Sequence, residues 1–289
     1  MSDHAFTTLR VSRDELAAEA LSADRLATVI DSIHTHGAAI IEGAVDLGHC
    51  DRLRVVMLED LPAALRHPSA LDTPGHLQHN PPPRARDLYA DIIANPVALS
   101  VARALMGRVR LALYTGNTML GHTSQQQPVH WDDYQLWSGL EQAPPTSSLA
   151  VNIPLVDVSV TNGALEVWPG THRDVRSGEH RKSLLVPDEW LEARRAHIPP
   201  VRVPLSKGAL LLRDLRMWHR GTTNSTGEAR PMLALSYQPW WYRPLAIDFY
   251  KDAEPVLTEL RVPVTARYRE SFDHLAWPPN WELVPAPVD

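Results

Sequence analysis

The sequence predicts a mainly β protein with flanking helices, in which a helical N-terminal third precedes a series of short strands. Before residue 108, apolar residues recur at three- and four-residue spacing, as in amphipathic helices. From Val109 onward the apolar segments become brief and are bounded by Gly, Pro, Asn or Ser, which is typical of a β-sandwich or barrel. The 25 prolines also indicate long ordered loops between the strands.

The N-terminal third is predicted to contain three helices and one strand. The first helix covers residues 22–33, and Gly37 follows it as a stop. The apolar run 38–45 is the first expected strand. Residues 51–61 and 96–106 form the other two helices, because their apolar residues share one helical face.

The remaining strands are expected in the second half of the chain. The predicted strands are 109–120, 149–156, 165–167, 201–205, 209–213 and 232–237. We expect one domain over residues 1–289, with a mostly helical part (1–108), a β core (109–242) and a C-terminal extension (243–289).

Composition argues against several classes of protein. The net charge of −6 is modest, and no basic stripe predicts binding to nucleic acid. No stretch reaches the roughly 20 apolar residues needed to cross a bilayer, so no membrane partner is expected. Cys50 is the only cysteine, which excludes an internal disulfide and fits a reducing compartment. The first residues lack a basic head and an apolar run, so we expect a cytoplasmic protein.

The triplet His130-Trp131-Asp132 and the later His219 form a candidate metal-ligand set. Two histidines and one carboxylate make the facial triad that holds iron(II) and leaves the opposite coordination positions open. On a strand, side chains two residues apart point the same way at roughly 6.6–7 Å, so His130 and Asp132 can reach one metal. Trp131 then faces the other way. The triplet alone is weak evidence, since 14 histidines make a later one unremarkable.

Arg230 strengthens the metal prediction. It follows His219 by 11 residues (230 − 219), across the Gly- and Asn-containing segment 221–225. This interval suits a strand, a turn and a return strand that places Arg230 near the metal. A guanidinium there can hold one end of a dicarboxylate through paired N–H donors, which a lysine cannot do.

At these motifs the chain resembles the phytanoyl-CoA dioxygenase family of Fe(II)- and 2-oxoglutarate-dependent oxygenases. The resemblance rests on Gln127-Pro128-Val129-His130-Trp131-Asp132, on the segment 162–173 and on the block from His219 to Arg230. Together they cover about half of the chain. The resemblance implies a double-stranded β-helix (jelly roll, cupin-like) core over residues 109–242, with the N-terminal helices outside one sheet.

The resemblance also implies the roles of the motif residues. His130, Asp132 and His219 would bind Fe(II), and Arg230 would pair with the far carboxylate of 2-oxoglutarate. With O2 as the second cosubstrate, the products would be succinate, CO2 and an oxidised substrate. Because Asp132 is present, hydroxylation, desaturation, epoxidation or rearrangement is favoured over halogenation, for which related enzymes vacate the carboxylate position.

Two further contacts to the cosubstrate are predicted. In some family members a glutamine at the position of Gln127 touches 2-oxoglutarate; the alternative is a loop residue in a polar run. Many members carry Thr where this chain has Leu165. Ser236 and Gln238 share strand parity with Arg230 and could supply the missing contact, provided that the strand has no bulge.

Aromatic and polar residues near the motifs are candidates for substrate binding. Tyr134 and Trp137 follow the metal triplet, Tyr114 and Thr118 lie on the preceding strand, and His79 lies in a loop that could cover the pocket. Aromatic walls would favour a flat or polycyclic, mostly uncharged substrate. Packing in the core or rim is the alternative for each of them.

The leading hypothesis is an enzyme that oxidises a small molecule, most simply an intermediate of secondary metabolism. Hydroxylation of an amino-acid-like solute or an acyl thioester in primary metabolism is the alternative within the same chemistry. A non-catalytic jelly-roll binding protein and a zinc hydrolase with the same three ligands are the rivals from other classes. The sequence leaves open whether the protein forms a homodimer.

Overall fold

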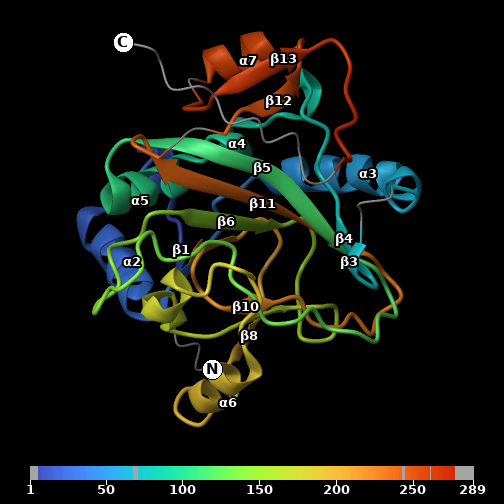
Figure 1. Ribbon diagram of the computed structural model, residues 1–289. Helices are drawn as coiled ribbons and strands as arrows, with labels where there is room; N and C mark the ends of the chain where they lie inside the picture. The colour runs from blue at the N-terminus through green and yellow to red at the C-terminus, as the bar shows by residue number, and fades with distance from the viewer. Residues whose placement is uncertain (1–5, 68–70, 243–244, 261, 277–289) are drawn as a thin grey trace.

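Two facing sheets and a layer of helices make up the protein. The computed structural model describes residues 6–67, 71–242, 245–260 and 262–276 (Figure 1). Residues 1–5 and 277–289 lie outside this range. The first segment is part of the N-terminus that we used to predict a cytoplasmic protein, and the second belongs to the predicted C-terminal extension. Among the described residues, no helix is both long and apolar enough to cross a membrane.

The large sheet has the strand order β1-β2-β9-β6-β11-β5-β4-β3 and is mixed, because β1 pairs with β2 in parallel while the other neighbours are antiparallel. The small sheet has the order β10-β7-β8. The large sheet contains β1 (Thr8–Arg10), β2 (Ala38–Glu42), β3 (Leu71–Thr73), β4 (His76–Gln78), β5 (Val109–Met119), β6 (Leu149–Pro154), β9 (Leu210–Asp214) and β11 (Arg230–Pro239). The small sheet contains β7 (Leu165–Val167), β8 (Val201–Val203) and β10 (His219–Arg220), and β12 (Ile247–Tyr250) pairs with β13 (Ala266–Arg269).

Helices flank the sheets, and in the N-terminal third they include the three predicted ones and two short ones that were not predicted. They are α1 (Arg13–Ala17), α2 (Ala23–His36), α3 (Leu47–Ala64), α4 (Ala90–Ile93), α5 (Pro96–Met106), α6 (Asp188–Arg195) and α7 (Ala253–Glu259). The predicted stop at Gly37 is confirmed, since this residue caps α2 at φ 90°. The start predicted for α3 is wrong by four residues, because the Asp46 side chain accepts a hydrogen bond from the backbone of His49 and caps the helix earlier.

Six predicted strands of the second half are confirmed, with small shifts at their ends. The three-residue strands β1, β3 and β4 of the N-terminal third were not predicted. Nor were three strands of the second half: β10 has only two residues, and β12 and β13 lack alternating burial. Their pairing depends on neighbours that are distant in sequence, so local periodicity does not reveal them. Helix α6 was missed as well, because it has only eight residues and buries none of them completely.

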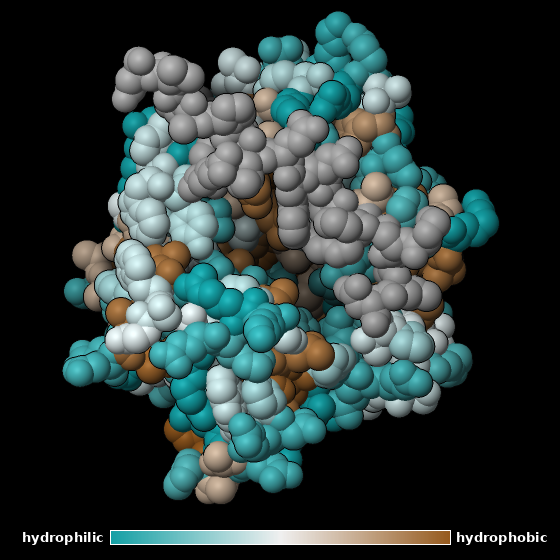
Figure 2. Space-filling model, viewed as in Figure 1, coloured by the Kyte–Doolittle hydropathy of each residue, from teal (hydrophilic) through white to brown (hydrophobic). Residues whose placement is uncertain are grey.

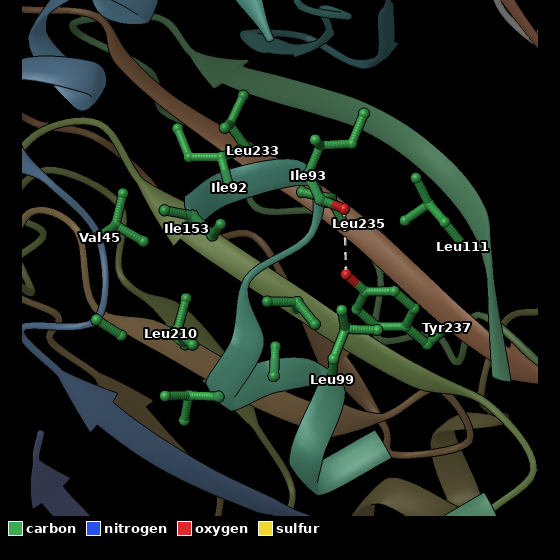
Figure 3. Close-up of a cluster of buried hydrophobic side chains, with 14 of the residues drawn as sticks. Val45, Ile92, Ile93, Leu99, Leu111, Ile153, Leu210, Leu233, Leu235 and Tyr237 are labelled. Carbon is green, nitrogen blue, oxygen red and sulfur yellow. Dashed lines mark hydrogen bonds between the residues drawn. The ribbon is translucent and has the colours of Figure 1, made fainter. Parts of the chain in front are cut away.

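The main core lies between the large sheet and the helices. Leu210 and Leu212 of β9 point into it, together with Leu233 and Leu235 of β11. Figure 3 shows Leu210, Leu233 and Leu235 converging on side chains from α4 and α5. The hydroxyl of Tyr237 donates a hydrogen bond to the carbonyl of Ile93 at 3.3 Å. The described part of the C-terminal extension joins this layer, because Phe249 and Leu257 belong to the same cluster.

A second core fills the space between the two sheets. Leu211 and Met232 of the large sheet meet Val167 and Val203 of the small sheet there. Because Leu211 alternates with Leu210 and Leu212, β9 separates the two cores, as the period-two geometry of a strand requires. Two facing sheets with helices outside one of them confirm the predicted jelly roll. In Figure 1 the small sheet and α6 lie on the side of β6 that is opposite to β12 and α7.

Tryptophans cover the outer side of the small sheet. Trp131, Trp168 and Trp218 are fully buried and form a cluster with the partly buried Trp190 of α6. Trp131 therefore faces away from the side of the triplet that carries His130 and Asp132. This packing holds the triplet through Trp131, on the side opposite to His130 and Asp132.

Candidate metal centre and its cavity

Paired backbone segments bring the three predicted metal ligands together. His130 and His219 exchange both backbone hydrogen bonds, at 2.9 and 2.8 Å, and the N–H of Asp132 donates to the carbonyl of Leu215. The Nε2 atoms of both histidines face the carboxylate of Asp132. His130 Nε2 lies 3.8 Å from Oδ1 of Asp132, and His219 Nε2 lies 3.4 Å from its Oδ2. All three donor atoms lie within 4.8 Å of one another, a spacing that can hold one metal ion.

The second ring nitrogen of each histidine fixes its orientation. Nδ1 of His130 is 2.9 Å from the carbonyl of Pro128, and Nδ1 of His219 is 3.0 Å from the carbonyl of Met217. When each Nδ1–H donates to this carbonyl, each Nε2 keeps its lone pair for a metal. Such outer hydrogen bonds are the usual way in which proteins orient metal-binding histidines.

Arg213 holds the carboxylate of the triad. Its Nη2 donates to Oδ2 of Asp132 at 2.7 Å, and its side chain is 4% exposed. Nη1 of Arg213 also lies 3.2 Å from Nδ1 of His219. That second approach is not a hydrogen bond when Nδ1 carries its proton, because both atoms are then donors. Arg213 was not among the sequence candidates, since nothing in its local pattern distinguishes it from a surface arginine.

The electrostatics favour the protonation states that a metal requires. Burial lowers the pKa of His219 well below its ordinary value, which keeps the imidazole neutral. Burial raises the pKa of Asp132, but His219 and Arg213 more than offset this, so the pKa lies below its ordinary value. Neutral imidazole and ionised carboxylate are the ligand forms that bind divalent cations.

The ligands open into a cavity of about 430 Å³ between the sheets. Figure 2 shows that one face of the molecule is hollowed near its centre, with hydrophobic residues visible inside the hollow. Aliphatic side chains and a comparable number of polar and charged side chains line the cavity. Its aliphatic lining includes Met119, Leu165, Leu184, Leu215, Met232 and Leu245.

Arg230 lies at one end of this cavity as a buried cation. It is 3% exposed, and it donates to the side chain of Asn117 at 3.2 Å and to the carbonyl of Gly163 at 2.9 Å. Within the described ranges it forms no ion pair with a carboxylate. Burial lowers its pKa to about 10, so it remains protonated at neutral pH. A buried charge without a counterion is costly, which favours an anionic ligand at this end.

Gln127 and His76 complete the wall near Arg230. Oε1 of Gln127 accepts a hydrogen bond from the N–H of Gly221 at 2.9 Å. A Cβ at Gly221 would lie 2.6 Å from the ring of His76 and 2.8 Å from Oε1 of Gln127, so a larger residue here would displace these two side chains. His76 pairs with Met119, which in turn pairs with Arg230, so the three stand side by side on β4, β5 and β11. His76 and Asn117 were missed because no motif surrounds them.

Ser236 lines the cavity but lies far from Arg230. The two side chains share a face of β11, yet six residues separate them, which is about 20 Å along a strand. The bulge that would disturb parity falls between Ser236 and Tyr237, and Gln238 still lines the cavity beyond it. Ser236 pairs with Ala150, which pairs with Arg213. The structure thus brings Ser236 to the level of Arg213 instead of the Arg230 end.

The structure separates the candidate substrate residues into two groups. Thr118 lines the cavity, although its hydroxyl lies 3.0 Å from Nδ1 of the fully buried His79. Tyr114 points to the opposite face of the sheet, where its ring stacks on Phe249 in the main core.

The two aromatic residues after the triplet also lie outside the cavity lining. Tyr134 packs beside Trp131 on the outer tryptophan cluster, and Trp137 is 57% exposed. The turn after Asp132 directs both rings away from the site, and strand parity does so for Tyr114. Sequence proximity to the triplet was therefore a poor guide to the walls of the pocket.

Two histidines, one carboxylate and a buried arginine in one jelly-roll cavity define a mononuclear metal site with a place for a dicarboxylate. The family model for phytanoyl-CoA dioxygenase matches residues 33–232. The chain belongs to this family and is a non-heme iron oxygenase that uses 2-oxoglutarate, with His130, Asp132 and His219 as the residues suited to hold the iron.

Solved structures share the fold. AviO1 from Streptomyces viridochromogenes Tue57 is 18% identical with a TM-score of 0.55, over 78% of this chain and 99% of that one. SnoK, a non-heme α-ketoglutarate-dependent carbocyclase from nogalamycin biosynthesis, is 18% identical with a TM-score of 0.55, over 76% and 84%. EctD from S. alaskensis with 2-oxoglutarate and 5-hydroxyectoine is 21% identical with a TM-score of 0.55, over 78% of each chain.

Proposed function

We propose that the protein oxidises a small molecule of secondary metabolism, by hydroxylation, desaturation, epoxidation or rearrangement, with release of succinate and CO2. The observation that carries this proposal is the buried Arg230, which lies in the same cavity as the three metal ligands and forms no ion pair with any described carboxylate. A zinc hydrolase with these ligands would have no use for a buried cation at this end. The aliphatic side chains in the lining support a substrate with an apolar part, and the similarity to SnoK from nogalamycin biosynthesis supports a role in secondary metabolism.

The residues have separate tasks in this proposal. His130, Asp132 and His219 would hold Fe(II), which supplies the activation of O2 when bound. Arg230 would receive the far carboxylate of 2-oxoglutarate by charge-assisted hydrogen bonds, with Asn117 holding its guanidinium in place. Gln127 shapes the wall through Gly221.

The other residues that line the cavity position a metal ligand or contact the substrate. Arg213 fixes Oδ2 of Asp132 and so leaves Oδ1 free to face a metal. The aliphatic side chains of the lining would contact the apolar part of a bound substrate. The presence of Asp132 supports oxygen insertion, hydrogen removal or rearrangement over halogenation.

Succinate formation tests the proposal. Purified protein with Fe(II) and 2-oxoglutarate in air should form succinate slowly by itself, and faster when the substrate is present. His219→Ala should abolish this succinate, whereas His197→Ala, which alters an exposed histidine, should not change it. Unchanged succinate formation in His219→Ala would refute the ligand assignment. Absence of 2-oxoglutarate binding in the parent would favour the non-catalytic alternative, and turnover without iron or O2 would favour the hydrolase.

A further inference from the structure

The cavity has a second polar end, opposite Arg230, to which neither the metal nor the cosubstrate assignment gives a task. β11 runs from Arg230 at one end of the cavity to Gln238 at the other, eight residues or about 26 Å along a strand. Asp133, Gln238 and Tyr242 line this second end. Because 2-oxoglutarate would occupy the Arg230 side of the metal, the substrate is left with this side.

Hydrogen bonds hold Asp133 in place at this end. Its Oδ1 accepts from the N–H of Tyr134 at 2.9 Å, and its Oδ2 accepts from the hydroxyls of Ser148 at 3.0 Å and Tyr242 at 3.4 Å. The hydroxyl of Ser148 in turn accepts from Nε2 of Gln238 at 3.4 Å. These contacts converge on one carboxylate and leave its position well defined.

The Asp133 end of the cavity retains hydrogen-bond acceptors that no described group uses. A carboxylate offers about four acceptor positions, and three of those on Asp133 are occupied. The O–H group of Tyr242 donates to Asp133, so the lone pairs of its oxygen remain available as acceptors. Over the part of the chain that the structure describes, Asp133 forms no ion pair, whereas the neighbouring Asp132 is paired with Arg213 and Asp214 with Arg216.

The two ends of the cavity are therefore complementary in charge. Among the described residues, the buried cation Arg230 at one end and the carboxylate Asp133 at the other form no ion pair. We propose that Asp133 and Tyr242 form a substrate subsite for a hydrogen-bond donor, so that the substrate is a largely apolar molecule with a hydroxyl or a protonated amine. This inference rests on the proposed function, because 2-oxoglutarate must occupy the Arg230 end for the other end to receive the substrate.

A matched set of ligands tests the subsite. The probes are 4-phenylbutan-1-ol, 4-phenylbutylamine, the methyl ether of that alcohol, and 4-phenylbutanoate, which share one apolar body and differ in the polar end. Each is titrated without O2 into protein loaded with Fe(II) and 2-oxoglutarate, after the 2-oxoglutarate affinity has been measured. The alcohol and the amine should bind at least tenfold more tightly than the ether, which only accepts, and the carboxylate, which Asp133 repels.

Two variants locate the binding and separate the two donors. Asp133→Asn keeps an acceptor but removes the charge, so the Kd of the amine should rise at least 30-fold and that of the alcohol less than fivefold. Tyr242→Phe should weaken whichever donor binds best by about threefold to tenfold. The control Tyr250→Phe removes a hydroxyl that contacts Phe272 away from the cavity lining, and it should change neither affinity.

The outcomes distinguish the two proposals. If the parent protein binds 2-oxoglutarate but holds the ether or the carboxylate as tightly as the alcohol and the amine, the donor subsite is refuted and the proposed function is untouched. Equal donor affinities in the parent, Asp133→Asn and Tyr242→Phe would refute it in the same way. If the parent does not bind 2-oxoglutarate, the proposed function itself is refuted and the subsite loses its basis.

Discussion

The two faces of the large sheet differ in what they bury. Toward the helices, Leu210 and Leu212 of β9 and Leu233 of β11 pack against other apolar side chains. Toward the small sheet, the same strands carry the buried Arg213 and Arg230. Burying a charge costs free energy that apolar side chains would not cost. One strand can thus stabilise the fold on one face and hold a ligand on the other.

If this division holds, substitutions on the two faces should have different effects. The largest effect is expected on the helix face. Leu233→Ala should lower the free energy of unfolding by about 2–5 kcal/mol, because it leaves a cavity among fully buried aliphatic side chains. Chemical denaturation measures this loss. The remaining folded protein should bind 2-oxoglutarate as the parent does, and a weakened affinity would show that the two faces are coupled.

The next largest effect is expected at the cation of the cavity face. Arg230→Lys should weaken 2-oxoglutarate binding by about 100-fold, or about 2.7 kcal/mol, because a lysine cannot pair with a carboxylate through two parallel N–H donors. Calorimetric titration without O2 measures this, and iron binding should stay close to that of the parent. Arg202→Lys, an exposed arginine on β8, is the matched control. Equal affinity in Arg230→Lys and the parent would contradict the assignment.

A smaller effect is expected at Arg213, which touches a metal ligand instead of the cosubstrate. Arg213→Met should weaken iron binding by about 10–100-fold, as is typical when a partner of a metal ligand is removed. Its loss leaves Oδ2 of Asp132 without the 2.7 Å contact. Competition with a chelator measures the affinity, and Arg213→Lys should recover part of it. If Arg213→Met binds iron like the parent, the arginine does not position Asp132.

The smallest effect is expected on the pH dependence of stability. It arises at His79, which contacts the cavity residue Thr118. Burial lowers the pKa of His79 from 6.5 to about 4, so the folded protein resists protonation while the unfolded chain does not. Stability is therefore complete above pH 6.5 and falls as the pH decreases toward 4. We expect a loss of about 1–2 kcal/mol at pH 5 from this residue. Denaturation at pH 7 and pH 5 should show a shallower loss in His79→Gln, and an identical slope would refute this.

The sequence was informative where chemistry depends on spacing along the chain. The His-x-Asp spacing, the later His219 and the interval to Arg230 predicted three ligands and a cation that the structure brings into one cavity. Helix and strand positions followed from periodicity, and glycine caps such as Gly37 placed their ends. These features are local, so one sequence was enough.

Features that depend on contacts between distant segments could not be predicted in this way. Tyr114 was placed near the metal, but strand parity sends it to the main core. The polar end at Asp133 is assembled from Ser148, Gln238 and Tyr242, which come from separate segments. Arg213 is similar, because the segment that follows β9 contacts the distant triplet through the hydrogen bond from the N–H of Asp132 to the carbonyl of Leu215, which places Arg213 beside Asp132.

The most direct test is a crystal structure of the protein grown without O2 in the presence of Fe(II) and 2-oxoglutarate. Anomalous scattering at the iron edge should place one metal ion between Nε2 of His130, Nε2 of His219 and a carboxylate oxygen of Asp132. The far carboxylate of 2-oxoglutarate should contact the guanidinium of Arg230. Iron bound elsewhere, or a 2-oxoglutarate molecule that does not touch Arg230, would contradict the account.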